Sequence, residues 1–358
     1  MLRNFIQFKK WLRPWVYLFK YMAWRKSPNK HSSSVCLQLG ENHASRNVYF
    51  FVKSIKSSGR SVFACTNPSF VRRLLKDHYA TLVLNEGLMK FAWRKPRNCL
   101  SIGIETNSQK KISYDYFALL LSTNPKQPNT YHVPIGMHPL QYHLGLDKRV
   151  FNANRNKALF FSGNLKPKFY KDFDPNNFFK MPGRLALFET LCSSDLPFTL
   201  NPDLKALKSE IWDGNVIVCD SDCCKVPHED WRGILAKMDF FLCFPGQAIP
   251  YCHNIYEAMS VGTIPILHQA YARLFSPFLK DGLHCFTFSD AEDFTKVCKK
   301  ALQTDDALLE KMHTAVSDYY YTNLTPEAVG HKITDPKIHK VFLQAEQYSL
   351  ALLTDKRS

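Results

Sequence analysis

The sequence predicts an α/β protein made of two doubly wound, Rossmann-like domains that face each other across a cleft. The chain has 358 residues, a comfortable length for two domains, and 45% of them are apolar, enough for two packed cores. Short apolar runs alternate with helical stretches in two series, separated by a polar stretch at residues 145–157. We expect a leading segment at 1–33, domains at 34–150 and 151–335, and a helix within 336–358 that braces the first domain.

Each series predicts a parallel sheet covered by helices on both faces. In the first series, helices are expected at 45–57 and 69–76, and strands at 34–39, 61–65, 80–84, 99–104 and 116–121. In the second, strands are expected at 158–162, 215–219, 240–244 and 263–267, and helices at 184–193, 228–237, 253–261, 291–301 and 336–353. Ligands of such sheets bind at the carboxyl ends of the strands.

The net charge of +16 favours anionic partners such as nucleotide diphosphates, acidic lipids or nucleic acid. Residues 1–40 hold eight Lys or Arg and no Asp or Glu. This excess lies in a Trp-rich amphipathic segment, which suits lipid better than nucleic acid, and the chain has no recognised nucleic-acid-binding module. We therefore expect no nucleic-acid partner.

Residues 1–26 predict peripheral attachment to an anionic membrane surface. No uncharged run approaches the ~18 residues of a transmembrane helix, and charges interrupt every candidate signal-peptide core. Bulky apolar residues recur at helical spacing on either side of Pro14, namely Phe5, Phe8, Leu12, Trp15, Phe19 and Met22. The alternative is a basic helix packed on its own domain. Residues 27–34 are expected to be a linker.

The eleven cysteines are odd in number and scattered through apolar runs, which suits a reducing compartment. Together with the leading segment, this predicts a cytoplasmic, peripherally membrane-associated protein. One cluster, Cys219, Cys223, Cys224 and His228, has the residue types of a zinc site. Adjacent cysteines rarely both bind one tetrahedral ion and no second Cys-x-x-Cys pair follows, so no metal is expected.

The most informative stretch follows the strand at 240–244. Pro245-Gly246 allows a tight turn or close backbone approach to a ligand, and a helix starts near His253. His253 and Glu257 are four residues apart and share a face. A helix amino terminus with a nearby His can hold a diphosphate, and the carboxylate can accept both hydroxyls of a ribose. The alternative is a solvated His–Glu pair on an ordinary amphipathic helix.

This stretch resembles the donor-binding segment of exostosin-like and related GT-B glycosyltransferases. That family has a Pro-Gly or Pro-x-Gly turn, a His-Arg-x-x-Glu-Ala-Leu helix and a Gly-x-Ile-Pro-Ile strand. The matching residues are 245–246, 253–259 and 262–266, within a match of about fifty residues. The run 160–164 (FFSGN) extends the resemblance more loosely.

The resemblance implies a GT-B fold and transfer of a sugar from a nucleotide-diphosphate donor to a glycan or lipid-linked acceptor, with inversion and without a metal cofactor. It places Glu257 at the donor ribose, His253 near the diphosphate and Arg184 where it offsets phosphate charge. The full donor-binding set is Ser162, Gly163, Arg184, Gly246, His253, Asn254 and Glu257.

One position departs from the family pattern. Asn254 stands where the family commonly has Arg, so Arg184 or Lys166 compensates, or donor handling differs. Asp220-Ser221-Asp222 matches a metal-binding DxD by letters, but we interpret it as coincidental, since this fold stabilises the leaving diphosphate with helix ends and basic side chains.

The catalytic base is expected on a loop after a strand of the first domain. Glu41 and His43 are the preferred candidates, and Glu86 and Glu105 occupy similar positions. Two other functions stay open. A fucosyltransferase-like enzyme shares the Glu-containing helix, although Ala258 stands where that family has Lys. A non-catalytic GT-B-like protein could bind glycans or act as a scaffold, which the Asn254 departure favours.

Overall fold

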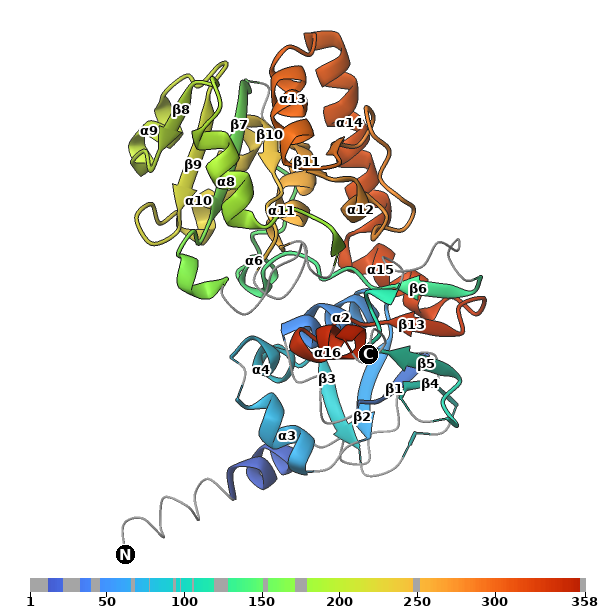
Figure 1. The fold of residues 1–358 in the computed structure, drawn as a ribbon. Helices are drawn as coiled ribbons and strands as arrows, with labels where there is room; N and C mark the ends of the chain where they lie inside the picture. Colours follow the sequence, from blue (N-terminus) through green and yellow to red (C-terminus); the bar gives the residue numbers. More distant parts are fainter. Residues whose placement is uncertain are drawn as a thin grey trace, which may run out of the picture. The chain divides into compact units, whose positions relative to one another are not determined.

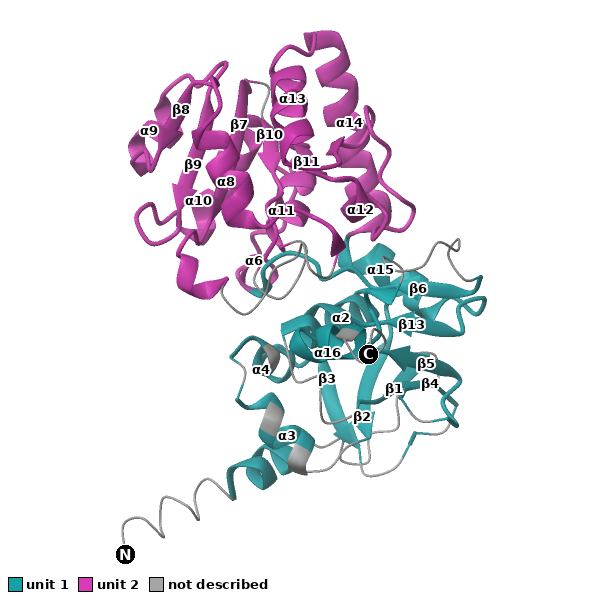
Figure 2. Ribbon diagram, in the orientation of Figure 1, with its two compact units in different colours: residues 1–139, 325–358 teal, residues 140–324 magenta. Residues whose placement is uncertain are grey.

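The chain folds into two compact units, residues 1–139 with 325–358 and residues 140–324 (Figure 2). The computed structural model describes residues 12–21, 33–39, 46–65, 68–76, 78–92, 95–96, 98–104, 106–118, 128–150, 154–170, 179–246 and 252–354. Within these ranges, no helix is long and apolar enough to cross a membrane.

The first unit contains a seven-stranded parallel sheet in the order β3-β2-β1-β4-β5-β13-β6 (Figure 1). Its strands are β1 (Ser34–Gln38), β2 (Ser61–Cys65), β3 (Met89–Ala92), β4 (Cys99–Gly103), β5 (Lys110–Ser113), β6 (Thr130–His132) and β13 (Lys340–Phe342). Its helices are α2 (Arg46–Ser57), α3 (Pro68–Leu74), α4 (His78–Asn85), α15 (Pro326–Thr334) and α16 (Gln347–Thr354), and α6 (Pro139–His143) spans the unit boundary.

The second unit contains a six-stranded parallel sheet in the order β12-β11-β10-β7-β9-β8. Its strands are β7 (Asn156–Gly163), β8 (Phe198–Leu200), β9 (Val216–Asp220), β10 (Met238–Leu242), β11 (Ile264–His268) and β12 (Phe286–Phe288). Its helices are η2 (Pro167–Phe169), α8 (Arg184–Cys192), α9 (Leu204–Ser209), α10 (His228–Ala236), α11 (Asn254–Ser260), α12 (Gln269–Ala272), α13 (Ala291–Leu302) and α14 (Asp306–Asn323).

The order of the second sheet defines its binding edge. β7 lies between β9 and β10; the chain leaves β7 toward the β8–β9 side and leaves β10 toward the β11–β12 side. Such a reversal opens a crevice at the carboxyl ends of the two central strands. Each of the two units is built on a parallel sheet, so the predicted α/β class with two doubly wound domains is confirmed.

Three sequence-based elements were wrong. Residues 80–84 belong to helix α4 rather than to a strand, and residues 336–353 contain strand β13 followed by α16 rather than one helix. The expected strand at 116–121 begins in a turn, and the strand of this region is β5. The units divide at 139/140 and 324/325, whereas the sequence predicts 150/151 and 335/336. The second boundary differs because α15 belongs to the first unit.

Gly330 is the point where α15 crosses α2. A Cβ atom there would lie 1.9 Å from the backbone oxygen of Ser54. We expect Gly330→Ala to lower the free energy of unfolding by about 1–3 kcal/mol, because the helices must separate. Gly233→Ala in α10 is the matched control: nothing lies within 4 Å of its Cβ position, so it should stabilise by about 0.4–1 kcal/mol. Equal effects of the two changes in urea unfolding would contradict the α2–α15 packing.

Candidate functional site

The predicted donor residues gather at the carboxyl ends of β7 and β10. Asn254, the first residue of α11, donates from Nδ2 to the backbone oxygen of Ser162 on β7 at 2.9 Å. A small cavity of about 10 Å³ adjoins this contact and is lined by Phe161, Arg184, Phe241, Leu242, Cys243, Phe244, Cys252, Asn254 and Ile255. Gly246 is buried in the turn that follows β10. The switch point of the sheet therefore carries the candidate site.

Arg184, the first residue of α8, is 7% exposed and donates hydrogen bonds in four directions. Its Nε donates to the Pro245 oxygen at 2.6 Å, and Nη1 donates to the Asn164 oxygen at 3.0 Å and to the Tyr170 hydroxyl at 2.7 Å. Nη2 donates to the Cys252 thiol at 3.2 Å. The guanidinium thus ties together the segments after β7, after β10 and before α11.

All of these acceptors are neutral. In the described part of the chain no carboxylate pairs with Arg184, and its guanidinium lies 5.4 Å from the ring centroid of Phe161 and 5.3 Å from that of Tyr170. Burial raises the pKa of Tyr170, which stays a neutral phenol. A buried charge without a counter-ion is costly, so this position favours an anionic ligand.

Gly163 permits this arrangement. A Cβ on Gly163 would lie 2.9 Å from the Phe161 ring and 3.0 Å from Nη1 of Arg184. Both distances are shorter than ordinary packing contacts, so a side chain would push the guanidinium away from the end of β7. The glycine is therefore needed for close approach of Arg184 rather than for an unusual backbone angle.

His253 and Glu257 form a buried polar chain with Trp231, which lies on α10. The His253 Nδ1–H donates to Glu257 Oε1 at 3.0 Å, and Trp231 Nε1–H donates to Glu257 Oε2. The Glu257 side chain is 1% exposed and the His253 side chain 31% exposed. The carboxylate therefore orients the imidazole, whereas the prediction from the resemblance places a ribose on it. Trp231 was not predicted, since nothing near it in the sequence points to α11.

In the structure the side-chain amide of Asn254 links α11 to β7 through its hydrogen bond to the Ser162 backbone oxygen. Of the two cations considered as replacements, Lys166 forms an ion pair with Asp222 at 2.5 Å. Arg184 has no such partner within the described residues and lines the cavity. Arg184 is therefore the better candidate for compensating the Asn254 departure.

The candidate metal ligands do not converge on one point. In the part of the chain that the structure describes, no three His, Cys, Asp or Glu side chains are arranged to hold a metal ion. This applies to Cys219, Cys223, Cys224 and His228, all of which are described. Asp220 accepts the backbone N–H of Asp222 at 3.2 Å.

Of the four candidates for the catalytic base, the structure describes only Glu86. Glu41, His43 and Glu105 lie outside the described residues. Glu86 precedes β3 and therefore lies at the amino edge of its sheet, the wrong edge for the predicted role. It also accepts hydrogen bonds from the Tyr49 hydroxyl at 2.7 Å and from Lys53 Nζ at 3.0 Å.

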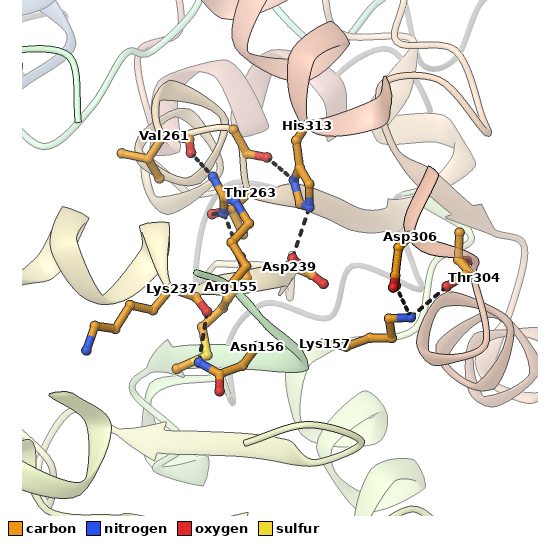
Figure 3. Close-up of polar contacts among 12 residues, drawn as sticks. Arg155, Asn156, Lys157, Lys237, Asp239, Val261, Thr263, Thr304, Asp306 and His313 are labelled. Atoms are coloured by element: carbon orange, nitrogen blue, oxygen red, sulfur yellow. Dashed lines mark hydrogen bonds and ion pairs between the residues drawn. The ribbon is translucent and has the colours of Figure 1, made fainter. Parts of the chain in front are cut away.

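A larger open cavity, of about 810 Å³, lies at the amino edge of the second sheet. Figure 3 shows the polar contacts around it: His313 bridges Asp239 and the Gly262 backbone, and Lys157 pairs with Asp306 at 2.6 Å. Arg155 donates to backbone oxygens of β10 and of the segment before β11. Because this cavity lies at the amino edge of the sheet, it is not the candidate site.

No family model matches the chain, and no curated protein sequence matches it. Among solved structures it is similar to Anabaena HepE in complex with UDP, at 9% identity and a TM-score of 0.44 over 85% of this chain and 99% of that one. It is also similar to a sucrose-phosphate synthase from Thermosynechococcus elongatus, at 10% identity and a TM-score of 0.42 over 84% and 97% of the two chains. A glycosyltransferase from Rickettsia africae has 10% identity and a TM-score of 0.41 over 91% and 100%. Identities and TM-scores this low carry no conclusion about the activity of this chain.

Proposed function

We propose that the chain is a GT-B glycosyltransferase that moves a sugar from a nucleotide-diphosphate donor to a glycan or lipid-linked acceptor. One observation carries the proposal: Arg184 is buried without a carboxylate partner among the described residues, at the switch point of the second sheet. His253 stands one residue before α11 at the same edge, oriented by Glu257. The segment 240–290 adds the exostosin-like resemblance.

The proposed chemistry needs no metal. An acceptor hydroxyl attacks the anomeric carbon, the bond from that carbon to the diphosphate oxygen breaks, and the nucleotide diphosphate leaves with the bonding electrons. Arg184 and a protonated His253 offset the charge that develops on the leaving group. A base in the first unit, Glu41 or His43, takes the proton of the acceptor, and attack opposite the leaving group inverts the anomeric centre.

A panel of UDP- and GDP-sugars tests the proposal. We expect one nucleotide diphosphate to raise the melting temperature of the purified chain, and its sugar to be transferred or slowly hydrolysed. Preference for a GDP-sugar would favour the fucosyltransferase-like alternative. Nucleotide binding without turnover of any donor would favour a non-catalytic glycan-binding or scaffold protein, and no binding of any nucleotide would refute the donor site.

We also propose that the leading segment attaches the enzyme to an anionic membrane surface on the cytoplasmic side. Residues 12–20 are helical. Leu12, Val16 and Phe19 follow each other at helical spacing and are 39%, 52% and 47% exposed. On the other side of this helix, Leu18 is 1% exposed. Both sequence interpretations are therefore compatible: one face packs on the protein, and the other presents apolar side chains outward.

Vesicle flotation tests the attachment. Replacing Leu12, Val16 and Phe19 together by Ser is expected to reduce binding to phosphatidylserine-containing vesicles about tenfold or more, because each side chain contributes apolar burial. Ile211→Ser is the matched control, since Ile211 is 82% exposed in the second unit. Equal flotation of the triple variant and the control would refute the membrane proposal.

A further inference from the structure

Three cysteines of the first unit lie on one face of its sheet. Cys36 on β1 pairs in register with Phe63 on β2 and with Ser101 on β4. Cys65 and Cys99 are each two residues away from those partners, on the same strands. Because side chains alternate between the faces of a strand, all three thiols point to one side of the sheet.

Cys36 and Cys65 are already close to bonding distance. Their Sγ atoms are 2.9 Å apart. A disulfide bond is about 2.05 Å long, so the two sulfur atoms need to approach by only about 0.9 Å. β1 is held between β2 and β4, which keeps the two strands from drifting apart.

The two thiols differ in access. Cys36 is fully buried at 0% exposure, whereas Cys65, the last residue of β2, is half-buried. Cys99 is buried at 6%. A small oxidant therefore reaches the trio first through Cys65.

We propose that Cys36 and Cys65 form an oxidation site that closes to an intramolecular disulfide in the presence of a disulfide oxidant such as oxidised glutathione. The Cys65 thiolate attacks oxidised glutathione, giving a mixed disulfide and one reduced glutathione. The Cys36 thiolate then attacks the Cys65 sulfur, forms the S–S bond and releases the second glutathione. The two thiol protons end on the two glutathione thiols, and the two electrons reduce the glutathione disulfide.

The surroundings of the pair slow its oxidation at neutral pH. The hydrogen bond with Cys65, followed by burial, raises the pKa of Cys36 well above its usual value. Burial likewise raises the pKa of Cys99. Thiolates are therefore scarce at neutral pH, and the second step should accelerate as the pH rises. The site does not depend on the proposed glycosyl transfer.

Peptide mapping of the full chain tests the site. The reduced protein is treated with oxidised glutathione at about pH 8, quenched with N-ethylmaleimide and digested with trypsin without reduction. Cys36, Cys65 and Cys99 fall on three separate tryptic peptides, 31–46, 61–72 and 98–110. We expect a cross-linked species of 31–46 with 61–72, and alkylated Cys99.

Variants make the outcome decisive. Cys65→Ser and Cys36→Ala should abolish the cross-link, and Cys99→Ser should keep it. Oxidation should raise the melting temperature of the unmodified chain and of Cys99→Ser by roughly 5 °C, because the bond closes a loop of the unfolded chain. A cross-link to 98–110, glutathione adducts confined to the exposed Cys192 and Cys223, or an equal temperature rise in Cys65→Ser would overturn the proposal.

Discussion

Replacing Arg184 by methionine is expected to weaken nucleotide-diphosphate binding about 10-fold or more and to lower the melting temperature of the ligand-free chain. Four of the five guanidinium N–H groups already donate within the chain, so one is left for a phosphate oxygen. Such a charge-assisted hydrogen bond contributes about 1.5–3 kcal/mol, and about 1.4 kcal/mol corresponds to tenfold in Kd. The loss of stability is expected because the backbone oxygens of Pro245 and Asn164 lose their donor. Calorimetric titration and thermal unfolding measure the two quantities.

Arg155→Met is the matched control for this experiment. Arg155 is also largely buried and donates to backbone oxygens, but it lies at the amino edge of the same sheet. Burial lowers the pKa of Arg155 to about 10, and the charge of nearby Asp239 opposes this shift. We expect this variant to lower the melting temperature and to leave nucleotide affinity unchanged. If instead Arg184→Met bound nucleotide as tightly as the unmodified chain, Arg184 would be only a structural tie between loops and the proposed anion site would be wrong.

The second large effect is expected for replacement of Glu257, and its form depends on whether the carboxylate orients His253 or binds the donor ribose. In the structure both of its oxygens are bonded, one to His253 and one to Trp231, and the side chain is almost inaccessible. We expect Glu257→Gln to lower kcat for glycosyl transfer about 10- to 100-fold with little change in KM, because a neutral amide orients the His253 imidazole less firmly than the carboxylate does. Steady-state kinetics with the preferred donor measures both constants.

Binding of truncated ligands distinguishes this role from contact with the ribose. If Glu257 orients His253, the Gln variant weakens binding of the nucleoside diphosphate but not of the nucleoside. If Glu257 binds the ribose hydroxyls, as the family resemblance implies, both ligands lose affinity equally. Trp231→Phe keeps the packing against Phe160 and Phe241 and removes one donor, so it should show a weaker form of the same kinetic change.

The local pattern of apolar and turn residues was enough to predict most of the second sheet from the sequence. The strand at 263–267 and the helix at 184–193 were predicted to within a residue because turn residues and apolar runs mark their ends clearly. Residues 80–84 were misassigned because five consecutive residues of mostly apolar character fit either a buried strand or a buried helix. β13 was missed because its partners, β5 and β6, lie more than two hundred residues earlier in the chain.

The part of the candidate site that is continuous in the sequence was predictable. Its contacts between residues far apart in the sequence were not. The turn, helix and strand at 245–266 carry their own sequence pattern. The contact of Trp231 with Glu257 and the contacts of Arg184 with Pro245 and Cys252 join residues 26 to 68 positions apart. No periodicity or spacing in the sequence predicts such pairs. The burial of the Arg184 charge and the contact of the Trp231 indole with Glu257 could therefore be recognised only in the structure.

The position of β13 also constrains how the chain matures on the ribosome. This strand sits inside the first sheet, between β5 and β6, yet it follows both of them by more than two hundred residues. The second unit, residues 140–324, is complete before β13 emerges and can fold while synthesis continues. Until then β5 and β6 stay unjoined, so the first sheet is completed only after the whole second unit has been made.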